Sequence, residues 1–168
     1  MKNIKLVIID VDGVLTDGAI YIDSEGREIK AFHVLDGTGI AYLHRASIKI
    51  AIISGRTCKA VIHRASELGI EDVYQGAKNK LDTYEEILKK YALRDEEICY
   101  IGDDLIDLPI FYCVGFPVSV ANASPLVKQH SLYVTNAKGG FGAVREVAEK
   151  ILKFQDKWNL IMERYREI

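Results

Sequence analysis

Two carboxylates, Asp10 and Asp12, follow directly on an apolar run near the start of the chain. The run is short, rich in branched side chains and followed by turn residues, a pattern typical of a buried strand. Because side chains alternate along a strand, both carboxylates should leave its end on the same side. They would repel each other there unless a cation lay between them, and Mg²⁺ suits this place because it takes oxygen ligands. The pair therefore predicts a magnesium site, with an acidic turn capped by glycines as the alternative.

Two further apolar runs end in polar residues that could handle a phosphate group. The run over residues 49–54 ends in Ser54-Gly55-Arg56, and the run over residues 98–102 ends in Gly102-Asp103-Asp104-x-x-Asp107. Parallel strands end at one edge of their sheet, where open α/β folds bind ligands. A carboxylate there can attack phosphorus, a metal ion can offset the repulsion between anions, and a second carboxylic acid can act as general acid and base. These residues therefore indicate phosphoryl transfer.

Strands and helices alternate along the chain, which predicts a three-layer α/β/α fold, doubly wound around a mainly parallel, Rossmann-like sheet. The strands are expected at residues 5–10, 49–54, 98–102, 114–120 and 132–135. Residues 19–33 break the alternation with two arms around Asp23-Ser24-Glu25-Gly26, which predicts a β-hairpin insert after the first strand. Apolar residues at helical spacing predict one long C-terminal helix over about residues 142–166.

The length and composition indicate one globular domain over residues 1–168. The chain is 49% hydrophobic and 27% charged, and its net charge of −2 argues against a nucleic-acid partner. No apolar stretch approaches the ~20 residues of a membrane span, and the first residues lack the pattern of a secretory signal peptide. We therefore expect a cytoplasmic protein with neither a membrane nor a nucleic acid as its partner.

Four segments of the chain resemble, in order, the four motifs of the haloacid-dehalogenase superfamily of phosphatases. They are Asp10-x-Asp12-Gly13-Val14-Leu15-Thr16-Asp17, Ser54-Gly55-Arg56, Lys80, and Gly102-Asp103-Asp104-x-x-Asp107. The resemblance implies that Asp10 is the nucleophile, that Asp12 is the general acid and base, and that Ser54 and Lys80 hold the phosphate. It also implies a Mg²⁺ cofactor with three protein ligands and two supporting residues. The ligands would be Asp10, Asp12 through its backbone carbonyl, and Asp103, and the supports would be Asp104 and Asp107.

Three of these residues also have plain structural explanations. Ser54 could simply cap a strand end. Lys80 could be a solvated lysine at a helix start, although its charge opposes the helix dipole there. Asp107 could be the N-cap of a helix that begins near Pro109.

The chain has no segment long enough for a cap domain, and further segments resemble the 3-deoxy-D-manno-octulosonate 8-phosphate phosphatase family. These segments are residues 30–40, 68–70, 74–76 and 139–146. The resemblance implies a capless homotetramer, with hairpins that assemble between subunits, acting on an acidic eight-carbon sugar phosphate. Arg56 and Arg64 would bind the sugar, with Asp12 and Lys80 at its phosphate end. The loop that lines the sugar would consist of His33, Val34, Leu35, Asp36 and Gly37.

Other positions bear on how the site is completed and which sugar it takes. Gly139-Gly140-Phe141-Gly142 would permit close backbone approach to a neighbouring subunit's site, or would simply lead into the last helix. A neighbour's C-terminal tail is another candidate to complete the site. Leu35 and Ala41 replace residues that are commonly basic in the family. Because charge-assisted hydrogen bonds are worth roughly 1.5–3 kcal/mol, these two departures leave the identity of the sugar open.

The leading hypothesis is a Mg²⁺-dependent phosphomonoesterase that releases phosphate from 3-deoxy-D-manno-octulosonate 8-phosphate through an aspartyl-phosphate intermediate. A phosphatase for a 9-phosphorylated nonulosonate is the first alternative. The second is a phospho-accepting receiver, which also places carboxylates, a hydroxyl and a lysine around Mg²⁺. The third is a non-catalytic oligomerisation domain linked to a cytidylyltransferase.

Overall fold

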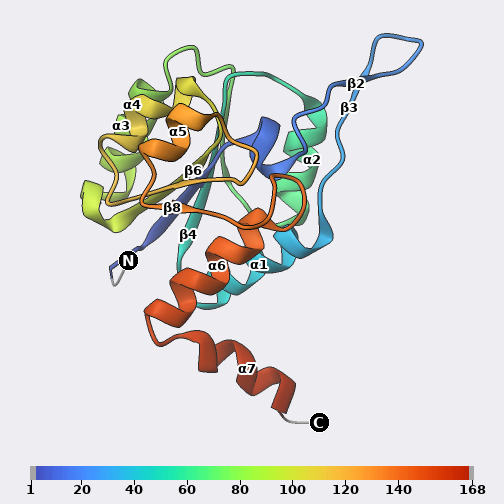
Figure 1. The fold of residues 1–168 in the computed structure, drawn as a ribbon. Coiled ribbons are helices and arrows are strands. Elements are labelled where there is room, and N and C mark those ends of the chain that lie inside the picture. Colours follow the sequence, from blue (N-terminus) through green and yellow to red (C-terminus); the bar gives the residue numbers. More distant parts are fainter. Residues whose placement is uncertain (1–2, 167–168) are drawn as a thin grey trace.

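The computed structural model describes residues 3–166 and contains a six-stranded parallel sheet in the order β5-β4-β1-β6-β7-β8 (Figure 1). Every neighbouring pair of strands in this sheet is parallel. The strands are β1 Leu6–Ile9, β4 Lys49–Ser54, β5 Asp72–Gln75, β6 Ile98–Gly102, β7 Phe116–Ser119 and β8 Tyr133–Val134. The chain reverses its direction of travel across the sheet between β5 and β6, so β1 and β6 meet at its centre. Ligands bind beside such a reversal in doubly wound sheets.

Helices cover both faces of the sheet, which confirms the three-layer fold. They are α1 Val34–Arg45, α2 Lys59–Glu67, α3 Lys80–Tyr91, α4 Leu108–Phe111, α5 Pro125–Gln129, α6 Ala143–Phe154 and α7 Trp158–Arg166. Helices α3, α4 and α5 lie on one side of the sheet, and α1, α2 and α6 lie on the other (Figure 1). Helix α6 packs along α1, so the last part of the chain lies on the same side of the sheet as the first helix.

The core is built around the two central strands. All four residues of β1 and all five of β6 are buried, as expected for parallel strands covered on both faces. Helix α6 contributes an apolar stripe at helical spacing to the same core. Its buried residues are Ala143, Val144, Val147, Ala148, Ile151 and Leu152.

The hairpin insert forms, although its strands are shorter than predicted. Strands β2 Tyr21–Ile22 and β3 Glu28–Ile29 pair antiparallel. The Asp23 carboxylate closes the turn by accepting backbone hydrogen bonds from Glu25 and Arg27, each 2.9 Å long. The hairpin projects from the body of the molecule (Figure 1), and within residues 3–166 no cap domain is inserted.

The structure corrects the sequence analysis at two elements. Strand β5 was not predicted, because Asp72-Val73-Tyr74-Gln75 carries two polar residues and lies at the edge of the sheet. The predicted helix over residues 142–166 is divided into α6 and α7. Asp156 adopts a left-handed conformation (φ 57°), and the Lys157 N–H bonds to the Leu152 carbonyl at 2.8 Å. This is a helix C-terminal motif that usually carries glycine, so the sequence signal for the break is weak.

None of the helices in residues 3–166 combines the length and apolar character needed to cross a bilayer.

Candidate active site

The carboxyl ends of β1, β4 and β6 enclose a pocket of about 180 Å³. The register explains this, since Ile9 of β1 lies beside Ile52 of β4 and Ile101 of β6. The next residues of the three strands therefore emerge together at one edge. The pocket is lined by Asp10, Asp12, Ser54, Gly55, Arg56, Asp103, Asp104 and Ile106. The structure thus brings together the predicted nucleophile, general acid and base, hydroxyl and guanidinium, and it adds Ile106, which the sequence analysis missed.

Lys80 joins this group from the first residue of α3. Its Nζ lies 2.9 Å from Asp10 Oδ1 and 2.7 Å from Asp107 Oδ1. Burial lowers the pKa of Lys80, but the charges of Asp10 and Asp107 outweigh burial and raise the pKa overall. The Lys80 side chain is 2% exposed, which excludes a solvated lysine. It is a buried cation held next to the predicted nucleophile.

Asp107 is held by donors on both of its oxygens. Oδ1 accepts from Lys80 Nζ and from the Tyr100 hydroxyl, each at 2.7 Å. Oδ2 accepts from the backbone N–H groups of Asp103 and Asp104, at 2.9 and 3.2 Å. These contacts favour the supporting role over that of a metal ligand, and they also show Asp107 closing the short helical turn Leu105–Asp107 that follows β6. Asp107 stands at the N-cap position of α4, but its side chain makes no capping hydrogen bond to that helix, so the N-cap explanation is not confirmed.

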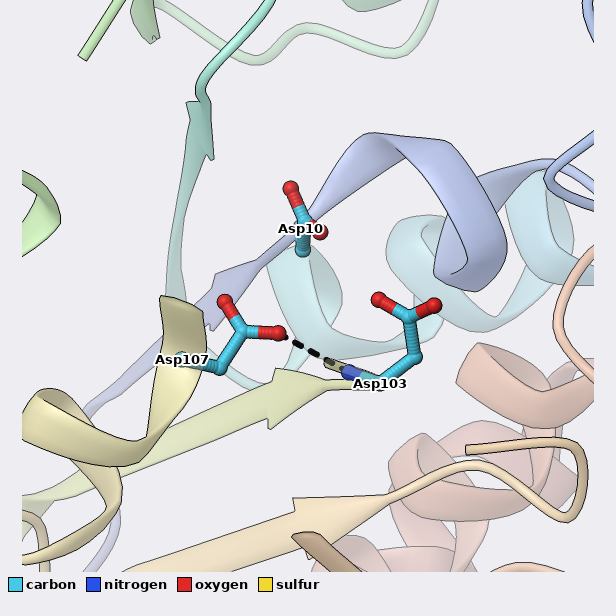
Figure 2. A group of neighbouring side chains, drawn as sticks. All are labelled: Asp10, Asp103 and Asp107. Atoms are coloured by element: carbon cyan, nitrogen blue, oxygen red, sulfur yellow. Dashed lines mark hydrogen bonds between the residues drawn. The ribbon is translucent and has the colours of Figure 1, made fainter. Parts of the chain in front are cut away.

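The carboxylates of Asp10, Asp103 and Asp107 lie near the Lys80 ammonium, so one positive charge offsets only part of three negative ones. One carboxylate oxygen each from Asp10, Asp103 and Asp107 lies within 4.8 Å of the others, and Figure 2 shows the three side chains converging. Burial raises the pKa of Asp10 to about 6, with Lys80 opposing the shift. Burial, and then the charges of Asp10 and Asp107, raise the pKa of Asp103 to about 7. Close, buried carboxylates of this kind are the oxygen donors that a hard divalent cation prefers, so the residues fit Mg²⁺.

The loop after β1 packs directly against the side chain of Asp103. Gly13 has φ 90°, and a Cβ at this residue would collide with the Asp103 carboxylate, so the loop after β1 needs glycine there. The segment around Gly139 and Gly140 packs on the other side of that loop, and the Gly140 N–H donates to the Val14 carbonyl at 2.9 Å. Gly139 and Gly140 thus lie close to the backbone of their own chain, and the approach to a neighbouring subunit stays a prediction.

The hairpin also reaches this site, which the sequence analysis did not foresee. Lys30 pairs with the Asp12 carboxylate and lies 2.7 Å from Glu28 Oε1. Glu28 Oε2 in turn lies 3.0 Å from Arg56 Nη2. Ser54, buried at the end of β4, accepts a 3.2 Å hydrogen bond from the Arg56 N–H. No local pattern distinguishes Lys30 from a solvated lysine, so the sequence held no signal for this contact.

The predicted sugar-binding loop lies outside the 180 Å³ pocket. His33 lines a neighbouring cavity of about 330 Å³, together with Asp17, Phe141 and Gly140. Val34 and Leu35 are exposed at the start of α1. Gly37 packs against Arg64, whose guanidinium pairs with Glu67 at 3.1 Å.

Asp36 needs a correction, because its carboxylate faces the protein interior and is 1% exposed. It accepts hydrogen bonds from the backbone N–H groups of Gly142 at 3.2 Å and Arg145 at 2.9 Å. Asp36 therefore caps the first turn of α6 and is not available to a sugar.

Comparisons with known proteins agree with this geometry. Residues 69–147 match the model of the haloacid dehalogenase-like hydrolase family. The 3-deoxy-D-manno-octulosonate 8-phosphate phosphatase of Yersinia pestis is 51% identical over 155 residues, which cover 92% of this chain and 83% of that protein. A crystal structure of the same enzyme from Moraxella catarrhalis, in complex with magnesium ion, phosphate ion and KDO, superposes with a TM-score of 0.95 at 44% identity. That match covers 98% of this chain and 94% of the other. A cobalt-bound structure of the Haemophilus influenzae phosphatase gives a TM-score of 0.90 at 42% identity, covering 93% and 91% of the two chains.

Proposed function

The chain belongs to the 3-deoxy-D-manno-octulosonate 8-phosphate phosphatase family of haloacid dehalogenase-like hydrolases, and we propose that it hydrolyses this sugar phosphate to the free sugar and phosphate. The observation that carries the proposal is the meeting of Asp10 and Asp103 in one pocket beside Lys80. Two partly neutralised carboxylates next to a buried ammonium form a place where a phosphate dianion and its counter-cation can both be held.

Five residues at this site carry the steps of the proposed reaction. The Asp10 carboxylate attacks phosphorus and forms an aspartyl-phosphate while the bond to the sugar oxygen breaks. Asp12 gives a proton to that oxygen and then takes one from the water that hydrolyses the intermediate. Lys80 and Ser54 hold the phosphate oxygens. Asp10, Asp103 and the backbone carbonyl of Asp12 would hold Mg²⁺, which would supply positive charge to offset the repulsion between the nucleophile and the phosphate.

The acidic sugar is expected to meet Arg56 first, because this side chain lines the pocket and is 47% exposed. Arg64, Leu35 and Ala41 lie outside the pocket lining, so they act on the sugar only at a distance from phosphorus. A 9-phosphorylated nonulosonate presents the same phosphate end with a longer acidic sugar. It is the runner-up substrate for that reason.

We infer further that the enzyme works in the cytoplasm as a homotetramer. The hairpin exposes apolar side chains on a projecting element, and an isolated two-stranded hairpin is marginally stable in water. Ile22 and Ile29 are 66% and 55% exposed, and Val34 beyond the hairpin is 76% exposed. Packing of hairpins between subunits would cover these residues. Analytical ultracentrifugation of the full chain tests the assembly, and a monomer at micromolar concentration would contradict it.

Phosphate release with Mg²⁺ tests the proposed function. The substrates are 3-deoxy-D-manno-octulosonate 8-phosphate, a 9-phosphorylated nonulosonate and neutral hexose phosphates. We expect the highest kcat/KM for the first. Higher kcat/KM for the nonulosonate would select the runner-up, and activity confined to hexose phosphates would contradict both. Stable phosphorylation of Asp10 without turnover would indicate a receiver.

A further inference from the structure

Lys30, which follows directly on strand β3 of the hairpin, has a side chain that is only 1% exposed. Lysine is seldom buried to this extent unless carboxylates surround its ammonium group. Here the ammonium lies between Asp12 Oδ1 and Glu28 Oε1, the latter at 2.7 Å. Asp12 belongs to the loop after β1 and Glu28 to β3, so Lys30 ties the projecting insert to the catalytic pocket.

The contact divides the two oxygens of Asp12 between two neighbours. Oδ1 accepts from Lys30, whereas Oδ2 lies 3.9 Å from Arg56 Nε, on the side of a residue that lines the pocket. A carboxylate gripped at one oxygen cannot rotate freely about its last side-chain bond. Lys30 therefore leaves Oδ2 as the oxygen that can exchange a proton with a bound ligand.

Glu28 completes the arrangement by contacting both cations. Its Oε1 lies next to Lys30 and its Oε2 lies 3.0 Å from Arg56 Nη2. Asp12, Lys30, Glu28 and Arg56 thus form a closed ring of two anions and two cations. Such a network loses less side-chain entropy for each contact than isolated pairs do, because each residue already ordered serves two partners.

We propose that Lys30 is a positioning residue that orients Asp12 for proton transfer, an inference that rests on the proposed phosphatase function. In the first step the proton on Asp12 Oδ2 moves to the sugar oxygen as the bond from that oxygen to phosphorus breaks and the bond from Asp10 forms. In the second step Oδ2 takes a proton from water as the water oxygen bonds to phosphorus and the bond from Asp10 to phosphorus breaks, which frees the Asp10 carboxylate and phosphate. Lys30 donates its hydrogen bond to Oδ1 throughout and is neither a donor nor an acceptor of the transferred proton.

The test compares two leaving groups, because only one of them needs the proton. An alkyl phosphate such as 3-deoxy-D-manno-octulosonate 8-phosphate releases a strongly basic alkoxide, whereas p-nitrophenyl phosphate releases a weakly basic phenolate. The value of kcat/KM reports the steps up to phosphoryl transfer to Asp10. For Lys30→Met we expect kcat/KM to fall about 100-fold with the alkyl phosphate, the lower end of the range for general acid catalysis. With p-nitrophenyl phosphate the fall should be less than about tenfold, since little proton transfer is needed there.

Three variants separate positioning from a structural effect. Lys30→Arg keeps the positive charge and should recover part of the loss with the alkyl phosphate. Lys30→Met placed in an Asp12→Asn background should cause little further loss, because residues that act through one another are not additive. Lys90→Met is the matched control, since Lys90 pairs with Asp72 away from the pocket, and it should leave both kcat/KM values unchanged.

Equal losses on the two substrates, an additive loss in the Asp12→Asn background, or an unchanged alkyl kcat/KM would each overturn the role of Lys30. If Lys30→Met does not fold by circular dichroism, Glu28→Gln replaces it. That variant weakens the contacts of Glu28 with both Lys30 and Arg56, so it is also measured in the Asp12→Asn background, where the part of its selective loss that acts through Asp12 should disappear. Wild-type protein that hydrolyses no alkyl phosphate would instead reject the proposed function itself, so the two failures are distinguishable.

Discussion

Two regions of this molecule bury an aspartate beside a lysine. They differ in how far the negative charge of the carboxylates is compensated by neighbouring groups. The catalytic cluster consists of Asp10, Asp103, Asp107 and Lys80, at the carboxyl ends of the central strands. The edge cluster consists of Asp72, Lys90 and Tyr91, near the beginning of β5. Three carboxylates share one lysine in the first cluster, whereas one carboxylate has a lysine and a tyrosine in the second.

The pKa values of the carboxyl groups express this difference. Burial raises the pKa of Asp72, but hydrogen bonds from Lys90 and Tyr91 outweigh burial and hold the pKa below its ordinary range. In the catalytic cluster the pKa values of Asp10 and Asp103 are raised to about 6 and about 7. In the edge cluster the negative charge of Asp72 is therefore compensated by its neighbours. The catalytic cluster retains negative charge that a cation can neutralise. Perturbed carboxyl groups in a cleft are typical of functional sites for this reason.

The largest expected contrast lies in the activities of the two aspartate variants. Asp10→Asn removes the proposed nucleophile and should lower kcat for phosphate release by at least about a thousand-fold. Asp72→Asn should leave kcat within about twofold, because Asp72 lies outside the pocket. Both are measured with p-nitrophenyl phosphate and Mg²⁺. Wild-type turnover by Asp10→Asn would remove the nucleophile assignment.

Replacement of the lysine should lower the unfolding free energy of the protein far more in the catalytic cluster than in the edge cluster. Lys80→Met leaves Asp10 and Asp107 buried without their cation, and loss of one partner from a buried pair costs about 3–5 kcal/mol of unfolding free energy. Lys90→Met should cost far less, since the Lys90 side chain is 52% exposed and water can replace it. Urea unfolding at pH 8 without Mg²⁺ measures both, and equal losses would contradict the contrast.

The two clusters should also respond to pH in opposite directions. The carboxyl groups of Asp10 and Asp103 ionise at about pH 4 in the unfolded chain and near 6 and 7 in the fold. Their stabilising contribution is therefore complete below about pH 4 and is lost as the pH rises toward 7. Asp72, with its lowered pKa, contributes above about pH 4 and loses its contribution at lower pH.

Thermal unfolding with EDTA and with Mg²⁺ checks this dependence. Mg²⁺ competes with protons for the same oxygens, so it should raise Tm more at pH 8 than at pH 5. Asp103→Asn should remove most of the Mg²⁺ effect, and Asp72→Asn should leave it intact. A Mg²⁺ shift that is the same at both pH values would argue against Asp10 and Asp103 as ligands.

The smallest expected effects come from the tyrosines. Tyr100→Phe removes a fully buried hydroxyl that donates to Asp107 at 2.7 Å, and it should lower the unfolding free energy by about 1–3 kcal/mol. Tyr91→Phe should have a smaller effect, because its ring is half-buried and Asp72 keeps hydrogen bonds from Lys90 and Tyr74. A larger loss for Tyr91→Phe in urea unfolding would reverse the proposed ranking.

Sequence reasoning succeeded where elements are local and strongly patterned. The apolar runs of β1, β4 and β6 predicted three buried strands, and their polar ends predicted the pocket. It failed at β5, which is an edge strand without an apolar run, and at the break after α6, where Asp156 takes a conformation usually left to glycine. Strand β5 is defined by its pairing with β4, and the break after α6 by a local hydrogen bond at a residue other than glycine, so neither has a strong pattern in the sequence.

By itself the sequence determined which chemistry is available and at which edge of the sheet it gathers. Parallel strands end on the same side, so Asp10, Ser54 and Asp103 had to lie near one another once those strands were buried. Only the tertiary structure decided that Lys30 forms an ion pair with Asp12 and that the Asp36 carboxylate is buried and caps α6. These contacts join segments far apart in the chain. Which residues meet in such contacts depends on how the layers pack. The periodicity of a single segment carries no information about that packing.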